Sequence, residues 1–130
     1  MAWKLQSPPR RKRSAVKIAI PRFGEAVAPC FEYSATIAIF DVEDGKVVSQ
    51  RDFTLQSQQE FDRVRLLRDQ GVNILICGGV QDRFEDVING LGIQVISWVS
   101  GSVDELIDSY LRGKLTPGTG RLGNPDRQTG

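Results

Sequence analysis

Short apolar runs alternate with amphipathic helix patterns in the second half of the chain, and this alternation limits the fold more than any other feature. Residues 72–77 (V-N-I-L-I-C) and 93–98 (I-Q-V-I-S-W) are rich in β-branched types and predict buried strands. Apolar residues at helical spacing predict helices over 58–69, over 82–91 and after Ser102. Strands and helices that alternate in this way form a parallel sheet with right-handed crossovers, so the sequence predicts an α/β fold.

The first half of the chain adds an antiparallel part to this sheet. Residues 16–20 (V-K-I-A-I), which stop at a proline, predict one strand, and the nearly all-apolar residues 35–42 predict a central one. Asp44 and Gly45 predict a tight hairpin turn into a more polar edge strand over 46–53. The patterns together predict a single domain with a five-stranded mixed sheet and three helices.

Helix ends are also marked in the sequence. Gly71, Gly92 and Gly113 each follow a helix pattern, and glycine favours the left-handed conformation that ends a helix. Ser102 and Glu105 have the spacing of a capping box, which predicts that the last helix starts directly after Ser102.

The composition is that of an ordinary globular chain. Of its 130 residues, 40% are hydrophobic and 25% are charged, which excludes a wholly disordered chain. The net charge of +1 gives no reason to expect a nucleic-acid or membrane partner. The chain is long enough to bury a core without a metal or a disulfide, and one domain is predicted over residues 16–115.

Both ends of the chain differ from this domain. Residues 1–15 contain a basic run and no acidic side chain, which predicts a flexible arm. A contact of this arm with nucleic acid, an acidic partner or an anionic cofactor is the alternative. Residues 116–130 are rich in glycine and proline and predict a disordered tail. Arg10 and Arg11 precede an apolar stretch too short for an export signal, so a cytoplasmic protein is expected.

The sequence contains two cysteines and no histidine. In a cytoplasmic protein, Cys30 and Cys77 are expected to be reduced thiols. The absence of histidine excludes His-based acid–base catalysis, His-containing zinc sites and haem held by histidine.

Three loops are expected to meet at the carboxyl ends of the parallel strands, where α/β proteins bind ligands. They comprise residues 21–34, 78–82 and 99–102, and two of them open helices whose N-terminal amides can hold an anion. The nucleotide-binding spacings G-x-G-x-x-G and G-x-x-x-x-G-K-[ST] are absent. The predicted cofactor-binding residues are Arg22, Gly24, Cys30, Phe31, Gly78, Gly79, Ser100 and Gly101.

The two cysteines have different expected roles. Cys30 lies in a loop near Arg22, which would favour the thiolate and make Cys30 a nucleophile or a soft-metal ligand. The alternative is a buried loop cysteine without a chemical role. Cys77 ends a buried strand, where a small core side chain is the usual role, and a second metal ligand is the alternative. Acidic residues, including Glu25 and Glu32 of the same loop, give only a weak catalytic pattern.

Five segments in order strongly resemble the dinitrogenase iron-molybdenum cofactor biosynthesis family, the NifX-like domain also found at the C-terminus of NifB-type proteins. They are K-I-A-I-P, G-x-x-V-A-P-C-F-E, I-F-D-V-E-D-G-K, G-V-N-I-L-I-C-G-G and V-D-E-L-I-D-S-Y-L-R-G-K-L, and the resemblance covers about residues 16–115. The resemblance implies a ribonuclease H-like motif without its nuclease carboxylates. It also implies binding and transfer of iron–sulfur or molybdenum–iron–sulfur clusters, a role in nitrogen fixation, and no enzymatic turnover.

Many members of this family have His-Phe-Gly where this chain has Cys30, Phe31 and Glu32. The resemblance therefore implies Cys30 as a cluster ligand in place of histidine, with Cys77 as a second ligand. The expected function is that of a carrier or accessory factor whose partners are a metallocluster and cofactor-assembly or acceptor proteins, with a homodimer left open. The alternatives are an interaction or regulatory module that binds no cluster and, more weakly, a thiol enzyme that uses Cys30.

Overall fold

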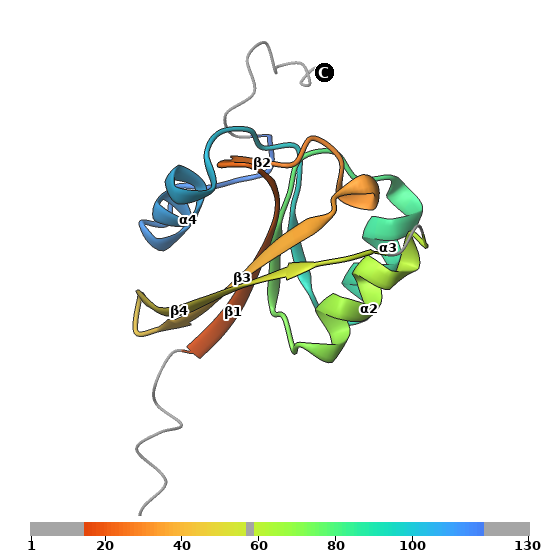
Figure 1. Cartoon of the computed structure of the whole chain (residues 1–130). Coiled ribbons are helices and arrows are strands. Elements are labelled where there is room, and N and C mark those ends of the chain that lie inside the picture. The colour runs from red at the N-terminus through yellow and green to blue at the C-terminus, as the bar shows by residue number, and fades with distance from the viewer. Residues whose placement is uncertain (1–14, 57–58, 119–130) are drawn as a thin grey trace, which may run out of the picture.

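A mixed β-sheet with helices on both faces forms the described part of the chain, residues 15–56 and 59–118 of the computed structural model (Figure 1). Along the sheet the strands follow the order β4-β3-β1-β5-β6, and the short β2 pairs with the end of β1. The strands are β1 (Ala15–Phe23), β2 (Ala26–Val27), β3 (Thr36–Glu43), β4 (Lys46–Thr54), β5 (Ile74–Ile76) and β6 (Gln94–Ile96). The helices are the 3-10 turn η2 (Phe31–Tyr33), α2 (Phe61–Asp69), α3 (Asp82–Gly90) and α4 (Val103–Leu111).

The strand directions agree with the sequence. β1 pairs antiparallel with β3 and parallel with β5, β5 pairs parallel with β6, and β3 and β4 form the predicted hairpin. Asp44 and Gly45 have φ angles of 54° and 80°, as a tight primed turn requires. The predicted mixed sheet and three α-helices are confirmed. The count of five strands is wrong by one, because the two-residue β2 gives no apolar pattern of its own.

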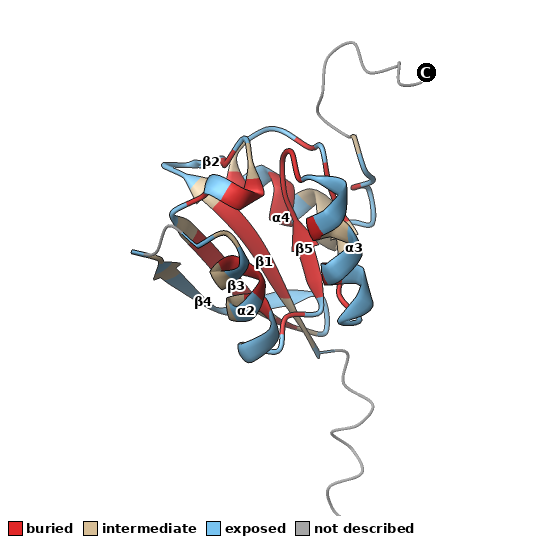
Figure 2. Cartoon of the chain, turned by 90° about the vertical axis from the view of Figure 1, so that its right-hand side faces the viewer, coloured by how far each residue is buried: buried red, intermediate tan, exposed pale blue. Residues whose placement is uncertain are grey.

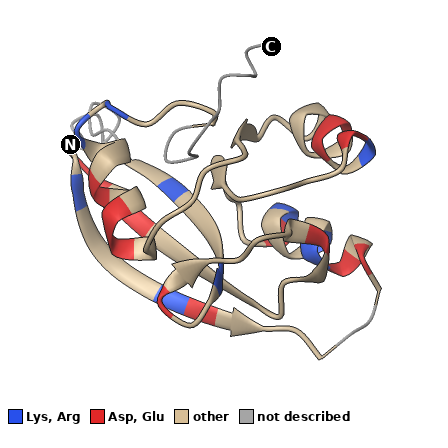
Figure 3. Ribbon diagram, turned by 90° about the horizontal axis from the view of Figure 1, so that it is seen from above, with Lys and Arg blue, Asp and Glu red and all other residues tan. Residues whose placement is uncertain are grey.

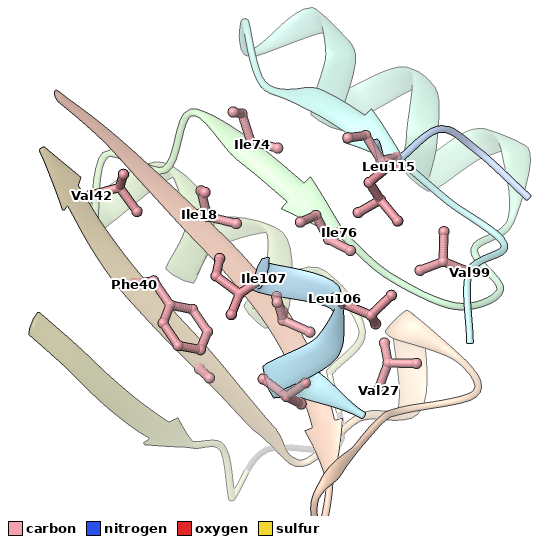
Figure 4. Close-up of a cluster of buried hydrophobic side chains, with 14 residues drawn as sticks. Ile18, Val27, Phe40, Val42, Ile74, Ile76, Val99, Leu106, Ile107 and Leu115 are labelled. Atoms are coloured by element: carbon pink, nitrogen blue, oxygen red, sulfur yellow. The ribbon is translucent and has the colours of Figure 1, made fainter. Parts of the chain in front are cut away.

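Helix α4 covers one face of the sheet, and α2 and α3 cover the other (Figure 1). Alternate residues of β1 point to opposite faces, so Ile18 and Ile20 join the core under α4 while Ala19 joins the core under α2 and α3. The α4 side chains Leu106 and Ile107 pack into the first of these clusters (Figure 4). The central strands are therefore buried on both faces. β4 lies at the edge of the sheet, as predicted, and is mostly exposed (Figure 2).

The predicted end of the first strand at the proline is wrong. β1 continues through Pro21, which pairs with Ile37, and ends only at Phe23. The extension turns back into β2 through Gly24, whose φ of 63° suits a two-residue turn, and Arg22 pairs with Val27. Proline lacks only the amide donor, so it is tolerated in a strand where the local pairing does not need that donor.

The remaining boundaries shift by a few residues. Helix α2 begins at Phe61, later than predicted, and residues 57–58 lie outside the described part. Residues 1–14 and 119–130, most of the predicted arm and tail, also lie outside it, so their assignment stays a prediction. Ala15 belongs to β1, and the Gly118 N–H donates to the Ser97 carbonyl at 2.9 Å. None of the helices in the described residues has the length and apolar character needed to cross a bilayer.

Candidate functional site

The loop between β2 and β3 is fastened to the segment after β5 by backbone hydrogen bonds. The Phe31 N–H donates to the Gly79 carbonyl and the Gly79 N–H donates to the Pro29 carbonyl, both at 2.8 Å. Cys30 and Gly79 form a parallel bridge, and the Phe31 side chain is fully buried in the core under α2 and α3. The first and second of the three predicted loops thus meet, as expected, through backbone pairing with each other.

The glycine pair allows this close approach. A Cβ atom on Gly78 would lie 2.6 Å from the Ala28 carbonyl oxygen, and one on Gly79 would lie 3.1 Å from the Pro29 carbonyl oxygen and from the Trp98 ring. Only glycine fits where backbone packs against backbone at this distance. Gly78 and Gly79 therefore serve loop packing in this structure, and their assignment to a cofactor stays a prediction.

An open cavity of about 750 Å³ lies on the other side of the same loop. It is bounded by the β1–β2 hairpin, the loop with Cys30, the start of β3 and one residue of β4. Of the residues predicted to bind a cofactor, Arg22, Gly24 and Cys30 line it, whereas Phe31, Gly78, Gly79, Ser100 and Gly101 do not. The further lining residues are Phe23, Glu25, Ala28, Pro29, Tyr33, Ser34, Ala35, Thr36 and Asp52.

Among the residues that the structure describes, Arg22 is the one basic residue that lines this cavity, and its guanidinium group already has partners. Its Nε donates to the Gly24 carbonyl at 2.8 Å. One terminal nitrogen lies 3.6 Å from a Glu25 carboxylate oxygen, and the other lies 3.5 Å from an Asp52 carboxylate oxygen. Arg22 therefore ties the β1–β2 hairpin to β4.

The Cys30 thiol lies at the cavity wall and is only partly exposed. Its Sγ donates to a Glu32 carboxylate oxygen at 3.5 Å. Burial, followed by the negative charge of Glu32, raises the pKa of the Cys30 thiol above its ordinary value. The expectation that Arg22 favours the thiolate is wrong, because the guanidinium group is paired with two carboxylates and Glu32 contacts the sulfur directly.

Glu32 is the polar residue that sequence reasoning undervalued. It is only 1% exposed, and its second carboxylate oxygen accepts the N–H of Gln81, the residue before α3, at 3.0 Å. The N-terminus of α3, expected to hold an external anion, is therefore occupied by the chain's own carboxylate. A single glutamate between two aromatic residues gave no pattern that indicates this contact across 49 positions of sequence.

The loop before α4 is also hydrogen-bonded to other parts of the chain. The Val103 N–H donates to the Glu25 carbonyl at 2.8 Å, and the Val27 N–H donates to the Gly101 carbonyl at 3.0 Å. Ser102 Oγ accepts the Glu105 N–H at 3.0 Å, so the predicted N-cap is confirmed. This loop, which includes Ser100 and Gly101, is bonded to β2, and in the first turn of α4 the Val103 and Glu105 N–H groups have acceptors within the chain. Few charged residues lie along the loops at this end of the sheet (Figure 3).

Arg63 is a second buried residue that the sequence analysis did not single out. Its Nε donates to the Ser34 carbonyl at 2.7 Å and one terminal nitrogen donates to the Gln59 carbonyl at 3.0 Å, so it clamps the end of the Cys30 loop onto α2. Its spacing of four from Leu67 places it on the buried face of the helix and was the available signal.

The second cysteine lies away from the cavity. Cys77 is completely buried in the core under α2 and α3. Burial raises the pKa of its thiol far above the ordinary value. Among residues 15–56 and 59–118, no three side chains of His, Cys, Asp or Glu lie close enough together to hold a metal ion. Cys30 is thus the thiol that the cavity presents.

Comparison with solved structures supports the fold. The protein PH0822 has a TM-score of 0.74 at 25% sequence identity, covering 78% of this chain and 94% of that one. A candidate NifB protein of Thermotoga has a TM-score of 0.61 at 27% identity, covering 84% of this chain and 98% of that one. Both superpose over nearly their whole length, so the described domain corresponds to a complete unit in these relatives.

Two sequence comparisons agree with this result. An uncharacterized protein of Methanocaldococcus jannaschii is 27% identical over 109 residues, which cover 80% of this chain and 92% of the relative. The family model described as "Dinitrogenase iron-molybdenum cofactor" matches residues 14–113. The match spans the whole described domain up to the end of α4 and confirms the resemblance that the sequence segments indicate. The chain therefore belongs to the dinitrogenase iron-molybdenum cofactor family.

Proposed function

We propose that this protein carries a metal–sulfur cluster, of the iron–sulfur or molybdenum–iron–sulfur kind, as cargo during the assembly of a metallocofactor. The observation that carries the proposal is the open cavity of about 750 Å³ with the Cys30 thiol at its wall, in a chain of this family. Thiolates are the preferred protein ligands of iron–sulfur clusters. The chain has no histidine that could take the place of Cys30.

The ligand chemistry fits a carrier that releases its cargo. Cys77 is buried, so the cavity offers one thiolate and otherwise holds the cluster by packing and hydrogen bonds. A fully ligated cubane uses four cysteines, so this chain holds a cluster more weakly than a permanent site does. The raised pKa of Cys30 also weakens cluster binding, because the metal must displace a proton that the thiol holds firmly.

We propose further that the domain has a ribonuclease H-like arrangement and that the protein is not an enzyme. The antiparallel β1–β3–β4 unit followed by parallel β5 and β6 supports a ribonuclease H-like motif. A carrier of this kind performs no turnover, and its partners would be assembly or acceptor proteins of a nitrogen-fixation type of pathway. Cys77 would become a ligand only if the end of β5 opened.

Anaerobic reconstitution tests the proposal. The purified full chain is incubated with ferrous iron and sulfide, desalted, and examined for visible absorption and for iron and sulfide content. We expect absorption bands in the wild type, a loss of most of the bound cluster in Cys30→Ala, and no such loss in the matched control Cys77→Ala. Circular dichroism establishes that each variant is folded. A wild type without bound cluster, or a Cys30→Ala variant that binds as well as the wild type, would contradict the proposal.

One observation favours the alternative of an interaction module that binds no cluster. Phe23 and Tyr33, which line the cavity, are 79% and 68% exposed. Exposed aromatic residues beside a cavity are typical anchors for a protein partner. A module of this kind would lose its partner on Phe23→Ala or Tyr33→Ala and keep it on Cys30→Ala, in a pull-down with cofactor-assembly proteins. The carrier predicts that Cys30→Ala changes cluster transfer.

A further inference from the structure

The charges that line the cavity do not favour an anion in the arrangement observed. Arg22 supplies one positive charge, and Glu25 and Asp52 supply two negative charges, so these three groups sum to one negative charge. Iron–sulfur clusters with thiolate ligands are anionic. Such a cargo meets net repulsion from these groups unless one carboxylate moves away from the guanidinium group.

The two carboxylates are held very differently. Asp52 belongs to β4, where it pairs with Ala38 across the sheet, and its side chain is 47% exposed. Glu25 lies in the two-residue turn between β1 and β2, and its side chain is 90% exposed. An exposed ion pair contributes little free energy, so the Glu25 side chain can turn toward water at small cost.

The guanidinium group is arranged so that Glu25 can leave without disturbing it. The bond from Nε to the Gly24 carbonyl and the contact of one terminal nitrogen with Asp52 hold Arg22 in place. The other terminal nitrogen is the one that faces Glu25. When Glu25 departs, this nitrogen offers its N–H donors to the cavity while the other two contacts stay intact.

We propose that Glu25 is a built-in competitor for the anionic cargo: it pairs with Arg22 when the cavity is empty and gives up that position when the cluster binds. This inference rests on the proposed function and deepens it. Return of Glu25 to Arg22 assists release of the cluster, and Asp52 acts as a positioning residue for the guanidinium group. Glu25, which does not touch the metal, thereby lowers the affinity for the cluster enough to allow its transfer.

The test compares three variants by anaerobic titration with a synthetic dianionic [4Fe–4S] tetrathiolate cluster, and by the rate at which an iron chelator removes the bound cluster. We expect Glu25→Gln to bind about two- to five-fold more tightly and to release correspondingly more slowly. Arg22→Gln is expected to bind about five-fold more weakly or worse. Asp69→Asn removes an exposed negative charge of an ion pair outside the cavity, with a side chain that is 61% exposed against 90% for Glu25. It serves as the control and is expected to bind as the wild type does.

The salt dependence separates competition from a structural effect. Because the repulsion is Coulombic, the ratio of Glu25→Gln to wild-type affinity should fall toward one as the salt concentration rises. Wild-type binding with no gain in Glu25→Gln, an equal gain in Asp69→Asn, or a gain that salt does not change would each overturn this inference and leave the proposed function intact. A wild type that binds no cluster would overturn both.

Discussion

The loop between β2 and β3 has two sides that differ in almost every physical respect. Toward β5 and α3 it is closed, with backbone paired to backbone at Gly79 and a buried carboxylate, Glu32, under the first turn of the helix. Toward β1 and β3 it is open, with a cavity, a partly exposed thiol and loosely held ion pairs around Arg22. On the closed side, the N–H groups of Phe31, Gly79 and Gln81 are bonded within the chain.

This difference separates stability from function within a few residues. The groups on the closed side cannot be changed without loss of a buried contact, because each has a fixed partner at short distance. On the open side the Glu25 carboxylate can exchange partners, because its side chain is 90% exposed and lies 3.6 Å from Arg22. In the candidate site, the closed side thus holds the Cys30 loop in a fixed position, whereas side chains on the open side can rearrange.

The largest expected effect comes from the closed side. Gly78→Ala would place a Cβ 2.6 Å from the Ala28 carbonyl oxygen, a backbone atom that cannot move without breaking the loop pairing. We expect a loss of about 3 kcal/mol or more in the free energy of unfolding, measured by urea denaturation.

Gly90→Ala is the matched control for this change. Gly90 is the last residue of α3, and a Cβ there has no heavy atom within 4 Å. Alanine is the better helix former, so this variant should gain up to about 1 kcal/mol. A Gly78→Ala protein as stable as Gly90→Ala would show that the two loops are not packed together as described.

The second prediction removes the buried carboxylate of the closed side. Glu32→Ala leaves the Gln81 N–H without its acceptor and opens a void beside Cys30, so we expect a loss of about 2–3 kcal/mol in the free energy of unfolding. Glu60→Ala, which removes a surface ion pair with Arg83, should cost less than about 1 kcal/mol in the same assay. Equal losses would mean that Glu32 acts only as a surface charge.

Most of the fold could be predicted from the sequence because its signals are local. The apolar periodicity of α3 and α4, the Asp44–Gly45 turn and the Ser102 cap depend on residues within one or two turns of each other. The error at Pro21 has a local cause as well, since the rule that proline ends a strand ignores the partner strand, β2, that lies just beyond it.

The candidate site was predicted less well, because its contacts join distant parts of the chain. Cys30 and Arg22 were placed at the cavity by their loop, but the partners that decide their chemistry, Glu32 and Asp52, depend on how the loop folds back and on the β3–β4 register. The filling of the α3 N-terminus by Glu32 could not be predicted from spacing. The sequence therefore identifies the thiol, but the direction of its pKa shift depends on burial and on Glu32, which no local pattern indicates.

A smaller effect is expected at the N-terminus of α4, which is capped locally rather than by a distant residue. Ser102→Ala removes the acceptor of the Glu105 N–H and should cost about 1 kcal/mol in the free energy of unfolding. Ser109→Ala, in the last turn of the same helix, keeps the cap and should be neutral or slightly stabilising. A loss as large as that of Glu32→Ala would show that the α4 cap also supports β2 and the hairpin.

The smallest expected effect concerns Cys30, whose thiol lines the cavity on the open side and contacts Glu32 of the closed side. Burial and then the negative charge of Glu32 raise the pKa of Cys30, so the neutral thiol is favoured and the thiolate fraction at pH 8 is below that of an ordinary cysteine. Glu32→Gln removes the negative charge, lowers this pKa, and should speed alkylation by iodoacetamide several-fold at pH 8. The difference should disappear above the pKa of the wild-type thiol, where both proteins are ionised. Cys77, which is buried, should remain unmodified until the protein unfolds. Equal alkylation rates at pH 8 would mean that burial alone, and not the Glu32 carboxylate, sets the reactivity of Cys30.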